Sequence, residues 1–282
     1  MKLLLILIFL LNCDSPKPGL TDEIKVSLLC RVAVACVPDT RGTKFGMIGD
    51  SWTDILFGVP VIETLRVQLE RYYGYRITGS TLGGQTLNTV NRSALYTRVI
   101  DEAGADIKYM LLSLGGNDLL GSPSGYVGKL EQEKQSRFNL LQTNFQQMIQ
   151  GGNAYKMQKY GGAPLIWIIH GYDYSNPDAK APDISTTGCR STYTSVGFTN
   201  EQVNSFAPSV LNDYNSFLVN LTRIEPQLKY IDLRGTLGLA PNGLQFSNAG
   251  NMFDCIHPTS GGFSLLAKKY VAVLQGYTNN EK

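Results

Sequence analysis

The residues best suited to chemistry in this chain are a histidine near its C-terminus and the groups that could work with it. His257 is one of only two histidines in the 282-residue sequence, and Asp254 precedes it by three positions. A turn of this length can bring the Asp254 carboxylate against the Nδ1–H of the imidazole, which fixes the tautomer and leaves Nε2 free to take a proton. The segment therefore predicts a general base that needs a nucleophile.

The best candidate for that nucleophile is Ser51, in the Gly-Asp-Ser segment at residues 49–51. A serine hydroxyl is a weak nucleophile until a base removes its proton, and His257 can do this and later protonate the leaving group. The tetrahedral oxyanion then needs hydrogen-bond donors, which the backbone N–H groups of Ser51 and Gly84 and the side-chain amide of Asn117 can supply. Glycine at position 84 also lets a substrate approach the backbone closely.

Regular elements must position these residues, and from residue 44 the chain alternates short apolar runs with helical patterns. This alternation predicts an α/β fold with a mainly parallel sheet and crossover helices. Five strands are expected, over residues 45–49, 75–78, 107–114, 165–169 and 229–233. Helices are expected over residues 60–73, after 86 to about 103, and over 132–150, 201–221 and 262–275. Each candidate group follows a strand, so we expect the groups to meet at the carboxyl edge of the sheet.

Each of these signals has a purely structural explanation when it is taken alone. Most serines in a Gly-Asp-Ser segment cap helices, and an asparagine within Gly-Gly-Asn-Asp is typical of a turn. Asp254 and His257 could form a hydrogen-bonded turn at the surface. Their occurrence in order, each after its own strand, favours one shared site.

Together the motifs resemble the SGNH-type, or GDSL-like, serine hydrolase superfamily. The matching segments are residues 49–51, 83–86, 115–118 and 254–258. The resemblance implies a flavodoxin-like three-layer α/β/α sandwich and a catalytic triad of Ser51, Asp254 and His257. It also implies an oxyanion hole made by Ser51, Gly84 and Asn117, with no metal or organic cofactor.

The chain departs from the family pattern at two positions. Gln85 follows Gly84 where the family often has Asp, and Trp-Thr-Asp at residues 52–54 follows the nucleophile in place of an apolar Leu, as it does in many members. The G-x-S-x-G elbow of α/β-hydrolases does not occur in the sequence.

Trp52 and His170 are candidates for the substrate pocket. Trp52 adjoins the nucleophile, and His170 ends the fourth expected strand at the same edge of the sheet. The alternative for His170 is a strand-end histidine that bonds the backbone. The long segment 171–199 shows no clear periodicity and is either a binding wall or an insertion.

The first residues carry a targeting signal. Residues 3–11 are all Leu, Ile or Phe, which suits the apolar core of a signal peptide and is too short to span a bilayer. Cys13 and a polar segment follow, so this start resembles a bacterial lipoprotein signal, with Asn12 in place of the usual small residue. An ordinary secretory signal with an incidental Cys13 is the alternative. The expected organisation is a signal peptide over 1–12, an N-terminal tether over 13–43 and a hydrolase domain over 44–282.

Four cysteines remain if Cys13 is lipidated, and they can pair in three ways. The expected pairs are Cys30–Cys36 and Cys189–Cys255, because the second would fasten a loop to the segment that holds Asp254 and His257. Free buried thiols are the alternative.

Composition and spacing exclude two classes of function. The formal net charge is +2 and Lys and Arg are scattered, so nucleic acid is not an expected partner. Two histidines and no C-x-x-C segment argue against a metal site. The expected protein is an exported serine hydrolase of the cell envelope that cleaves lipid or short-acyl esters, anchored to the membrane if Cys13 is processed. Two alternatives stay open: a carbohydrate O-acetylesterase of the envelope, and a non-catalytic surface-binding lipoprotein on the same fold.

Overall fold

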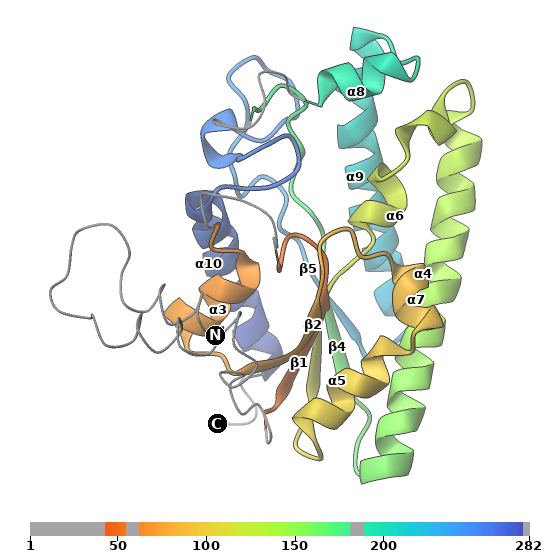
Figure 1. Ribbon diagram of the computed structural model, residues 1–282, viewed down its shortest axis with the longest axis vertical. Coiled ribbons are helices and arrows are strands. Elements are labelled where there is room, and N and C mark those ends of the chain that lie inside the picture. Colours follow the sequence, from red (N-terminus) through yellow and green to blue (C-terminus); the bar gives the residue numbers. More distant parts are fainter. Residues whose placement is uncertain (1–42, 55–61, 181–188, 279–282) are drawn as a thin grey trace, which may run out of the picture. The chain divides into compact units, whose positions relative to one another are not determined.

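The apolar runs form five parallel strands in one sheet, in the order β2-β1-β3-β4-β5. The computed structural model describes residues 43–54, 62–180 and 189–278 (Figure 1). The strands are β1 (Phe45–Gly49), β2 (Ile77–Thr81), β3 (Tyr109–Ser113), β4 (Ile166–His170) and β5 (Leu228–Ile231). Every residue of the central strand β3 is buried, as expected for a parallel sheet that is covered on both faces.

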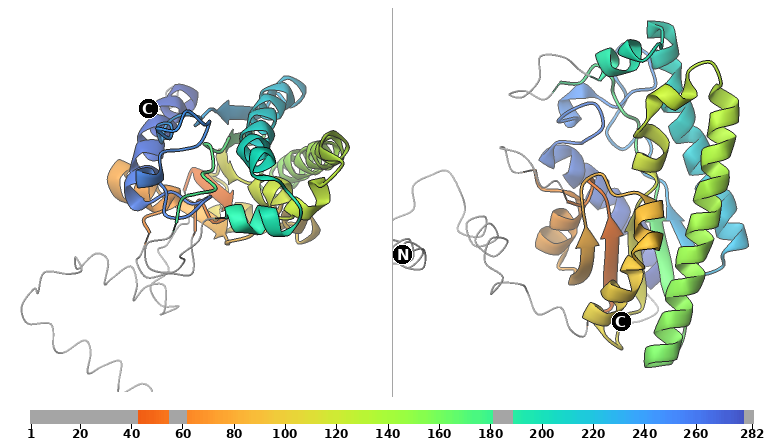
Figure 2. Two further views of the ribbon diagram at one scale, coloured as in Figure 1. Left: turned by 90° about the horizontal axis from the view of Figure 1, so that it is seen from above. Right: turned by 45° about the vertical axis from the view of Figure 1, so that its right-hand side comes forward.

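Helices cover both faces of this sheet (Figures 1 and 2). α3 (Leu65–Tyr73) packs against α10 (Ser260–Thr278) on one face. The other face carries α4 (Leu87–Arg92), α5 (Leu95–Ala103), α7 (Leu130–Tyr160) and α9 (Asn200–Ile224). Shorter elements lie at the carboxyl edge of the sheet: α6 (Gly116–Leu120), α8 (Arg190–Ser195) and the 3₁₀ turns η2 (Pro123–Tyr126) and η3 (Ala249–Asn251). The predicted three-layer α/β/α sandwich is confirmed, and its strand order is that of flavodoxin-like sheets.

The helix expected after residue 86 is in fact two helices, α4 and α5. Ser93 ends α4 by returning its hydroxyl to the Thr89 carbonyl, and Ala94 adopts a left-handed backbone with φ 46°. This conformation costs a non-glycine residue about 1–2 kcal/mol. It redirects the chain so that α5 packs on β1 and β2 while α4 packs on α7. Tertiary packing therefore overrides a continuous local pattern.

Helix α7 continues well past its expected end at residue 150. The pair Gly151–Gly152 has the composition of a helix stop, yet both glycines are helical. A Cβ at Gly152 would lie 2.6 Å from Cζ2 of Trp167, and one at Gly151 would lie 2.7 Å from the hydroxyl of Tyr96. Gly152 therefore lets α7 approach the sheet closely, Gly151 lets it approach α5, and neither glycine ends the helix.

Other differences from the expected elements are small. Strand β2 begins later than expected, and the segment after β3 starts the short helix α6, for which no helix was expected. The segment 171–199 contains α8, which its sequence pattern did not indicate. The expected signal peptide, Cys13 and the Cys30–Cys36 pair lie outside the described residues. Within the described ranges, no helix is long and apolar enough to cross a membrane.

Candidate active site

The turn that carries Ser51 is built around the buried carboxylate of Asp50. Its Oδ1 accepts hydrogen bonds from the Trp52 backbone N–H at 3.1 Å and the Ser113 hydroxyl at 2.9 Å. Its Oδ2 accepts one from the hydroxyl of Tyr172. Burial raises the pKa of Asp50 to about 6, although these hydrogen bonds pull it back toward its ordinary value. The carboxylate therefore fixes the turn itself through Trp52 and ties it to the end of β3 and to the segment after β4.

The loop between η3 and α10 presents His257 toward that turn. Asp254 Oδ1 accepts the backbone N–H groups of Ile256 at 2.9 Å and His257 at 2.7 Å. Asp254 Oδ2 lies 2.8 Å from Nδ1 of His257. Burial alone would raise the pKa of Asp254, but the hydrogen bond and charge of His257 outweigh it and hold that pKa below its ordinary value. The aspartate is thus an ionised orienting partner for the imidazole.

The other ring nitrogen of His257 completes the contact. Its Nε2 lies 2.8 Å from Oγ of Ser51, although the two residues are 206 positions apart. One line of hydrogen bonds therefore runs from the Ser51 hydroxyl through the imidazole to the Asp254 carboxylate. In this geometry a proton can pass from serine to histidine while the aspartate stabilises the charged ring.

Each of the three expected oxyanion donors has an N–H group without an acceptor among the described residues. Within the described part of the chain, the backbone N–H groups of Ser51 and Gly84 have no protein acceptor. The turn that holds Gly84 lies beside the serine, because a Cβ on Gly83 would come 4.0 Å from the Ser51 Cβ. The Asn117 amide donates one N–H to the Gln85 carbonyl at 3.0 Å, which orients the group and leaves its second N–H available.

A pocket of about 200 Å³ opens next to Ser51. Ser51, Trp52 and Asn117 belong to its wall, whereas Gly84 does not. Most of the remaining wall is apolar and comes from α6, α8, α9 and the segment after β4. Its larger side chains include Leu120, Tyr172, Tyr193 and Leu211. The pocket is therefore a mainly apolar space whose wall includes Ser51 and Asn117.

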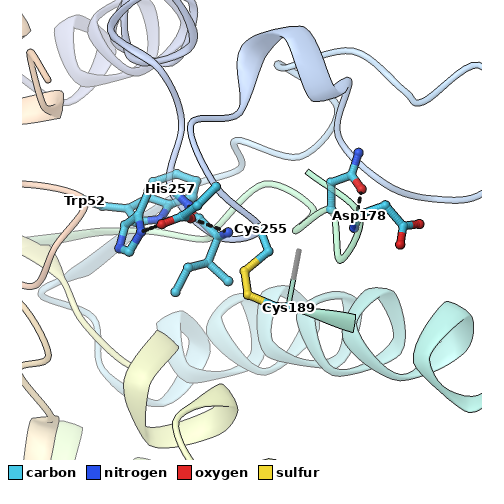
Figure 3. Close-up of a disulfide and its surroundings, with 8 residues drawn as sticks. Trp52, Asp178, Cys189, Cys255 and His257 are labelled. Atoms are coloured by element: carbon cyan, nitrogen blue, oxygen red, sulfur yellow. Dashed lines mark hydrogen bonds and ion pairs between the residues drawn. A yellow bond between two sulfur atoms is a disulfide. The ribbon is translucent and has the colours of Figure 1, made fainter. Parts of the chain in front are cut away.

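A disulfide joins the pocket wall to the histidine loop. Cys189, at the start of α8, lines the pocket and is bonded to Cys255, with a Cα–Cα distance of 5.7 Å. Figure 3 shows this bridge beside His257 and Trp52. This expected pair is present, so its two cysteines are not free thiols. The bridge fixes the backbone between Asp254 and His257.

Of the two residues expected in the substrate pocket, Trp52 lines it and His170 does not. Trp52 lines the pocket, but His170 is 1% exposed, lies against the face of Trp52 and does not reach the wall. His170 Nδ1 lies 3.1 Å from the Gly171 carbonyl. Burial lowers the pKa of His170 to about 4, so the ring is neutral at ordinary pH. The structure thus places His170 behind the pocket, where it supports the tryptophan.

Sequence reasoning missed Tyr172, which lines the pocket and also donates to Asp50. Its position just after a buried strand, at the edge where the other candidates gather, was the available signal. It missed the pocket residues Tyr193 and Leu211 as well, because they lie on helices whose role in the wall depends on tertiary packing.

A parallel α/β/α sandwich with serine, histidine and aspartate in hydrogen-bond contact at its carboxyl edge is the architecture of a serine hydrolase. The chain belongs to the GDSL-like lipase/acylhydrolase family, whose sequence pattern matches residues 41–270. It is therefore an ester-hydrolysing enzyme, as the sequence predicts. No curated protein matches the sequence significantly.

Solved structures share the fold at low sequence identity. The lipase Lip_vut3 from a goat rumen metagenome has a TM-score of 0.54 and 17% identity over 82% of this chain and 96% of its own. An acetyl xylan esterase from Geobacillus stearothermophilus has a TM-score of 0.50 and 14% identity over 82% of this chain and 94% of its own. These likenesses concern the architecture.

Proposed function

We propose that this enzyme is an exported serine hydrolase that cleaves short-acyl carboxylic esters through an acyl-enzyme intermediate. The observation that carries the proposal is the line of hydrogen bonds from Ser51 through His257 to Asp254 at the end of an apolar pocket. In this assignment Ser51 is the nucleophile, His257 is the general base and then acid, and Asp254 orients the imidazole.

The reaction follows from these contacts. Ser51 Oγ attacks the ester carbonyl carbon while its proton passes to Nε2 of His257. The negative oxygen of the tetrahedral intermediate accepts hydrogen bonds from the N–H groups of Ser51 and Gly84 and from the free amide N–H of Asn117. Collapse of the intermediate expels the alcohol, which takes the proton from His257. A water molecule, deprotonated by His257, then attacks the acyl-enzyme and releases the carboxylic acid.

The size of the pocket supports a short acyl group. Its volume of about 200 Å³ is below the range of roughly 300–1,000 Å³ typical of sites for drug-sized ligands. A water molecule occupies about 30 Å³ of liquid, so the space suits an acyl group of roughly two to six carbons. The same observation favours a second candidate function, the removal of O-acetyl groups from carbohydrate. Both candidates use the same serine chemistry and differ in the alcohol that leaves.

A fluorophosphonate probe tests the chemistry, because it reacts only with an activated serine. We expect it to label the wild-type protein and not Ser51→Ala. The matched control is Ser195→Ala, which removes an exposed serine hydroxyl of α8 and should label normally. Folded wild-type protein that does not label would favour the non-catalytic surface-binding alternative and overturn the proposal.

A series of p-nitrophenyl esters from acetyl to palmitoyl tests the substrate. We expect kcat/KM to be highest for short chains and to fall once the acyl group exceeds the pocket. Acetylated xylan or peptidoglycan fragments, assayed for released acetate, distinguish the carbohydrate O-acetylesterase from a general short-acyl esterase. A maximum at palmitoyl would contradict the short-acyl assignment and favour a lipid substrate.

We also propose that the protein is exported and anchored to the membrane through a lipid on Cys13. The apolar run before Cys13 and the polar residues after it support this assignment. The Cys189–Cys255 disulfide supports an oxidising compartment. Metabolic labelling with a palmitate analogue should mark the wild-type protein and not Cys13→Ala. Equal labelling of both proteins would refute the anchor.

A further inference from the structure

We propose that Trp52 is a positioning residue that holds the histidine loop against the nucleophile turn through its indole N–H. The inference rests on the proposed function of Ser51 and His257. It assigns a role to Trp52, whose side chain connects the nucleophile turn to the histidine loop. Trp52 directly follows the serine in the chain, and its side chain reaches the residue that directly precedes the histidine.

The contact that carries the inference is one hydrogen bond. Nε1 of Trp52 donates to the backbone carbonyl of Ile256 at 3.0 Å, across 204 positions of sequence. The backbone of Trp52 is itself fixed, because its N–H donates to Asp50 and its carbonyl accepts the Leu65 N–H at 3.0 Å. The indole is therefore a rigid link whose two ends are the nucleophile turn and the histidine loop.

Three aromatic rings hold the indole in the orientation that this bond requires. His170 stacks on it with ring centroids 5.9 Å apart. Tyr172 and Phe263 meet it edge-on, with centroid distances of 4.9 and 5.8 Å. Trp52 is only 5% exposed, so a change of rotamer would disturb all of these contacts. The donor is thus preorganised, and His170, which does not reach the pocket, gains a role as its support.

The link matters because the histidine loop has few other direct attachments to the nucleophile turn. Asp254 orients the imidazole from within the same loop, and the disulfide ties the loop to α8. Two direct hydrogen bonds join the described residues of the nucleophile turn (49–54) to the histidine loop (252–258). One is the contact between Ser51 and His257, and the other is the bond from the Trp52 indole to Ile256. A displacement of about 1 Å between nucleophile and base can reduce a rate about 100-fold. Loss of the indole N–H should therefore affect catalysis more than folding.

The chain supplies its own matched control, because it has only two tryptophans. Trp167 is also fully buried and its Nε1 also donates at 3.0 Å, to Asn153, but it lies in β4 beneath α7 and does not line the pocket. Trp52→Phe and Trp167→Phe therefore remove the same donor and a similar volume from two different places. Replacement of Trp52 by β-(3-benzothienyl)alanine in the Trp167→Phe background exchanges the N–H for sulfur and preserves the ring shape. This second variant keeps the comparison interpretable if Trp52→Phe folds poorly.

The first readout is steady-state hydrolysis of p-nitrophenyl acetate. We expect Trp52→Phe and the benzothienyl variant to lower kcat by about 10- to 100-fold, because the base is displaced. KM should stay within about threefold in the benzothienyl variant, because its ring keeps the shape of the pocket wall. Trp167→Phe should keep the wild-type kcat even though its melting temperature falls. A kcat within twofold of wild type in both position-52 variants would overturn the inference.

The second readout does not depend on turnover. Because only two histidines are present, the ring protons of His257 can be assigned by NMR, and its Hδ1 should be protected by Asp254 in the wild type and in Trp167→Phe. In the position-52 variants this resonance should be lost to solvent exchange. The two failures can be told apart. A wild-type protein that shows neither turnover nor probe labelling would refute the proposed function. An Hδ1 resonance that is unchanged in the position-52 variants would refute the role of Trp52.

Discussion

The two N–H groups of the Asn117 amide have different roles in the proposed site. One N–H holds the Gln85 carbonyl at 3.0 Å, and the other is free to meet an oxyanion at the pocket wall. Gly115, with a left-handed φ of 97°, is the N-cap of α6, and Asn117 in this helix lines the same pocket as Ser51. In the proposed mechanism this free N–H stabilises the transition state more strongly than the bound ester.

Replacing Asn117 by alanine should lower kcat by about 100- to 1,000-fold, the usual effect of removing one oxyanion donor. KM should change little, because the ground-state carbonyl gains less from this donor. The control is Asn91→Ala, which also removes an asparagine amide bonded to a backbone carbonyl, that of Asn144 at 2.8 Å, and does not line the pocket. Equal losses of kcat in the two variants would show that Asn117 acts only through stability.

Asp50 links stability to pH. Its pKa is raised from 3.8 to about 6 in the folded protein, so the folded state binds this proton more tightly than the unfolded state. Its favourable contribution is fully present below pH 3.8 and is lost as pH rises through about 6. At pH 8 the buried carboxylate therefore disfavours folding by up to about 3 kcal/mol. Asp50→Asn, which cannot ionise, should gain stability relative to wild type between pH 4 and 8.

Urea denaturation of both proteins across this range measures the difference in free energy of unfolding. The two proteins must be compared because the stability of each also depends on His170. The pKa of His170 is lowered from 6.5 to about 4, so stability is lost as pH falls from 6.5 toward 4, which is opposite in sign to the effect of Asp50. That contribution is common to both proteins and cancels. A difference that does not change with pH would contradict the buried ionisation of Asp50.

At the scale of elements, the close approach of α7 to the sheet depends on Gly152, which has no side chain. Gly152→Ala should lower the free energy of unfolding by about 2 kcal/mol, because the new methyl group would overlap the ring of Trp167 inside a filled core. Gly276→Ala in α10 is the control, since nothing lies within 4 Å of its Cβ position. That change should raise stability by up to about 1 kcal/mol through helix propensity. If both substitutions stabilise the protein, the core has room beside Trp167.

The same comparison shows where sequence reasoning reaches its limit. The strands, their parallel arrangement and the meeting of Ser51 with His257 follow from apolar runs and from the rule that ligands gather at the carboxyl ends of strands. The break at Ala94 and the continuation of α7 through Gly151–Gly152 do not, because each is decided by what the helix touches across the core. The Trp52–Ile256 bond is also invisible in the sequence, since a backbone carbonyl has no residue signature.

At the scale of the whole molecule, the Cys189–Cys255 bridge spans 66 residues and closes α8 onto the histidine loop. Removing it with the double variant Cys189→Ser/Cys255→Ser should lower the free energy of unfolding by up to about 4 kcal/mol in the chain-entropy description. We expect KM to rise, because the α8 wall is no longer fastened to the loop, and kcat to fall less than in Trp52→Phe. Urea denaturation and steady-state kinetics check both effects, and wild-type values of stability and KM would contradict them.

The positions of Ser51 and His257 along the chain also determine when the proposed activity can begin during synthesis. Ser51 follows the first strand along the chain and His257 follows the last, so 206 residues of synthesis separate the two groups that must meet. At roughly 5–20 residues per second, the serine leaves the ribosome on the order of 10 to 40 s before its base exists. During that interval the serine has no partner to activate it. Under the proposed triad a nascent chain therefore carries Ser51 without its base, and the activity begins only when the last elements of the chain have folded against the sheet.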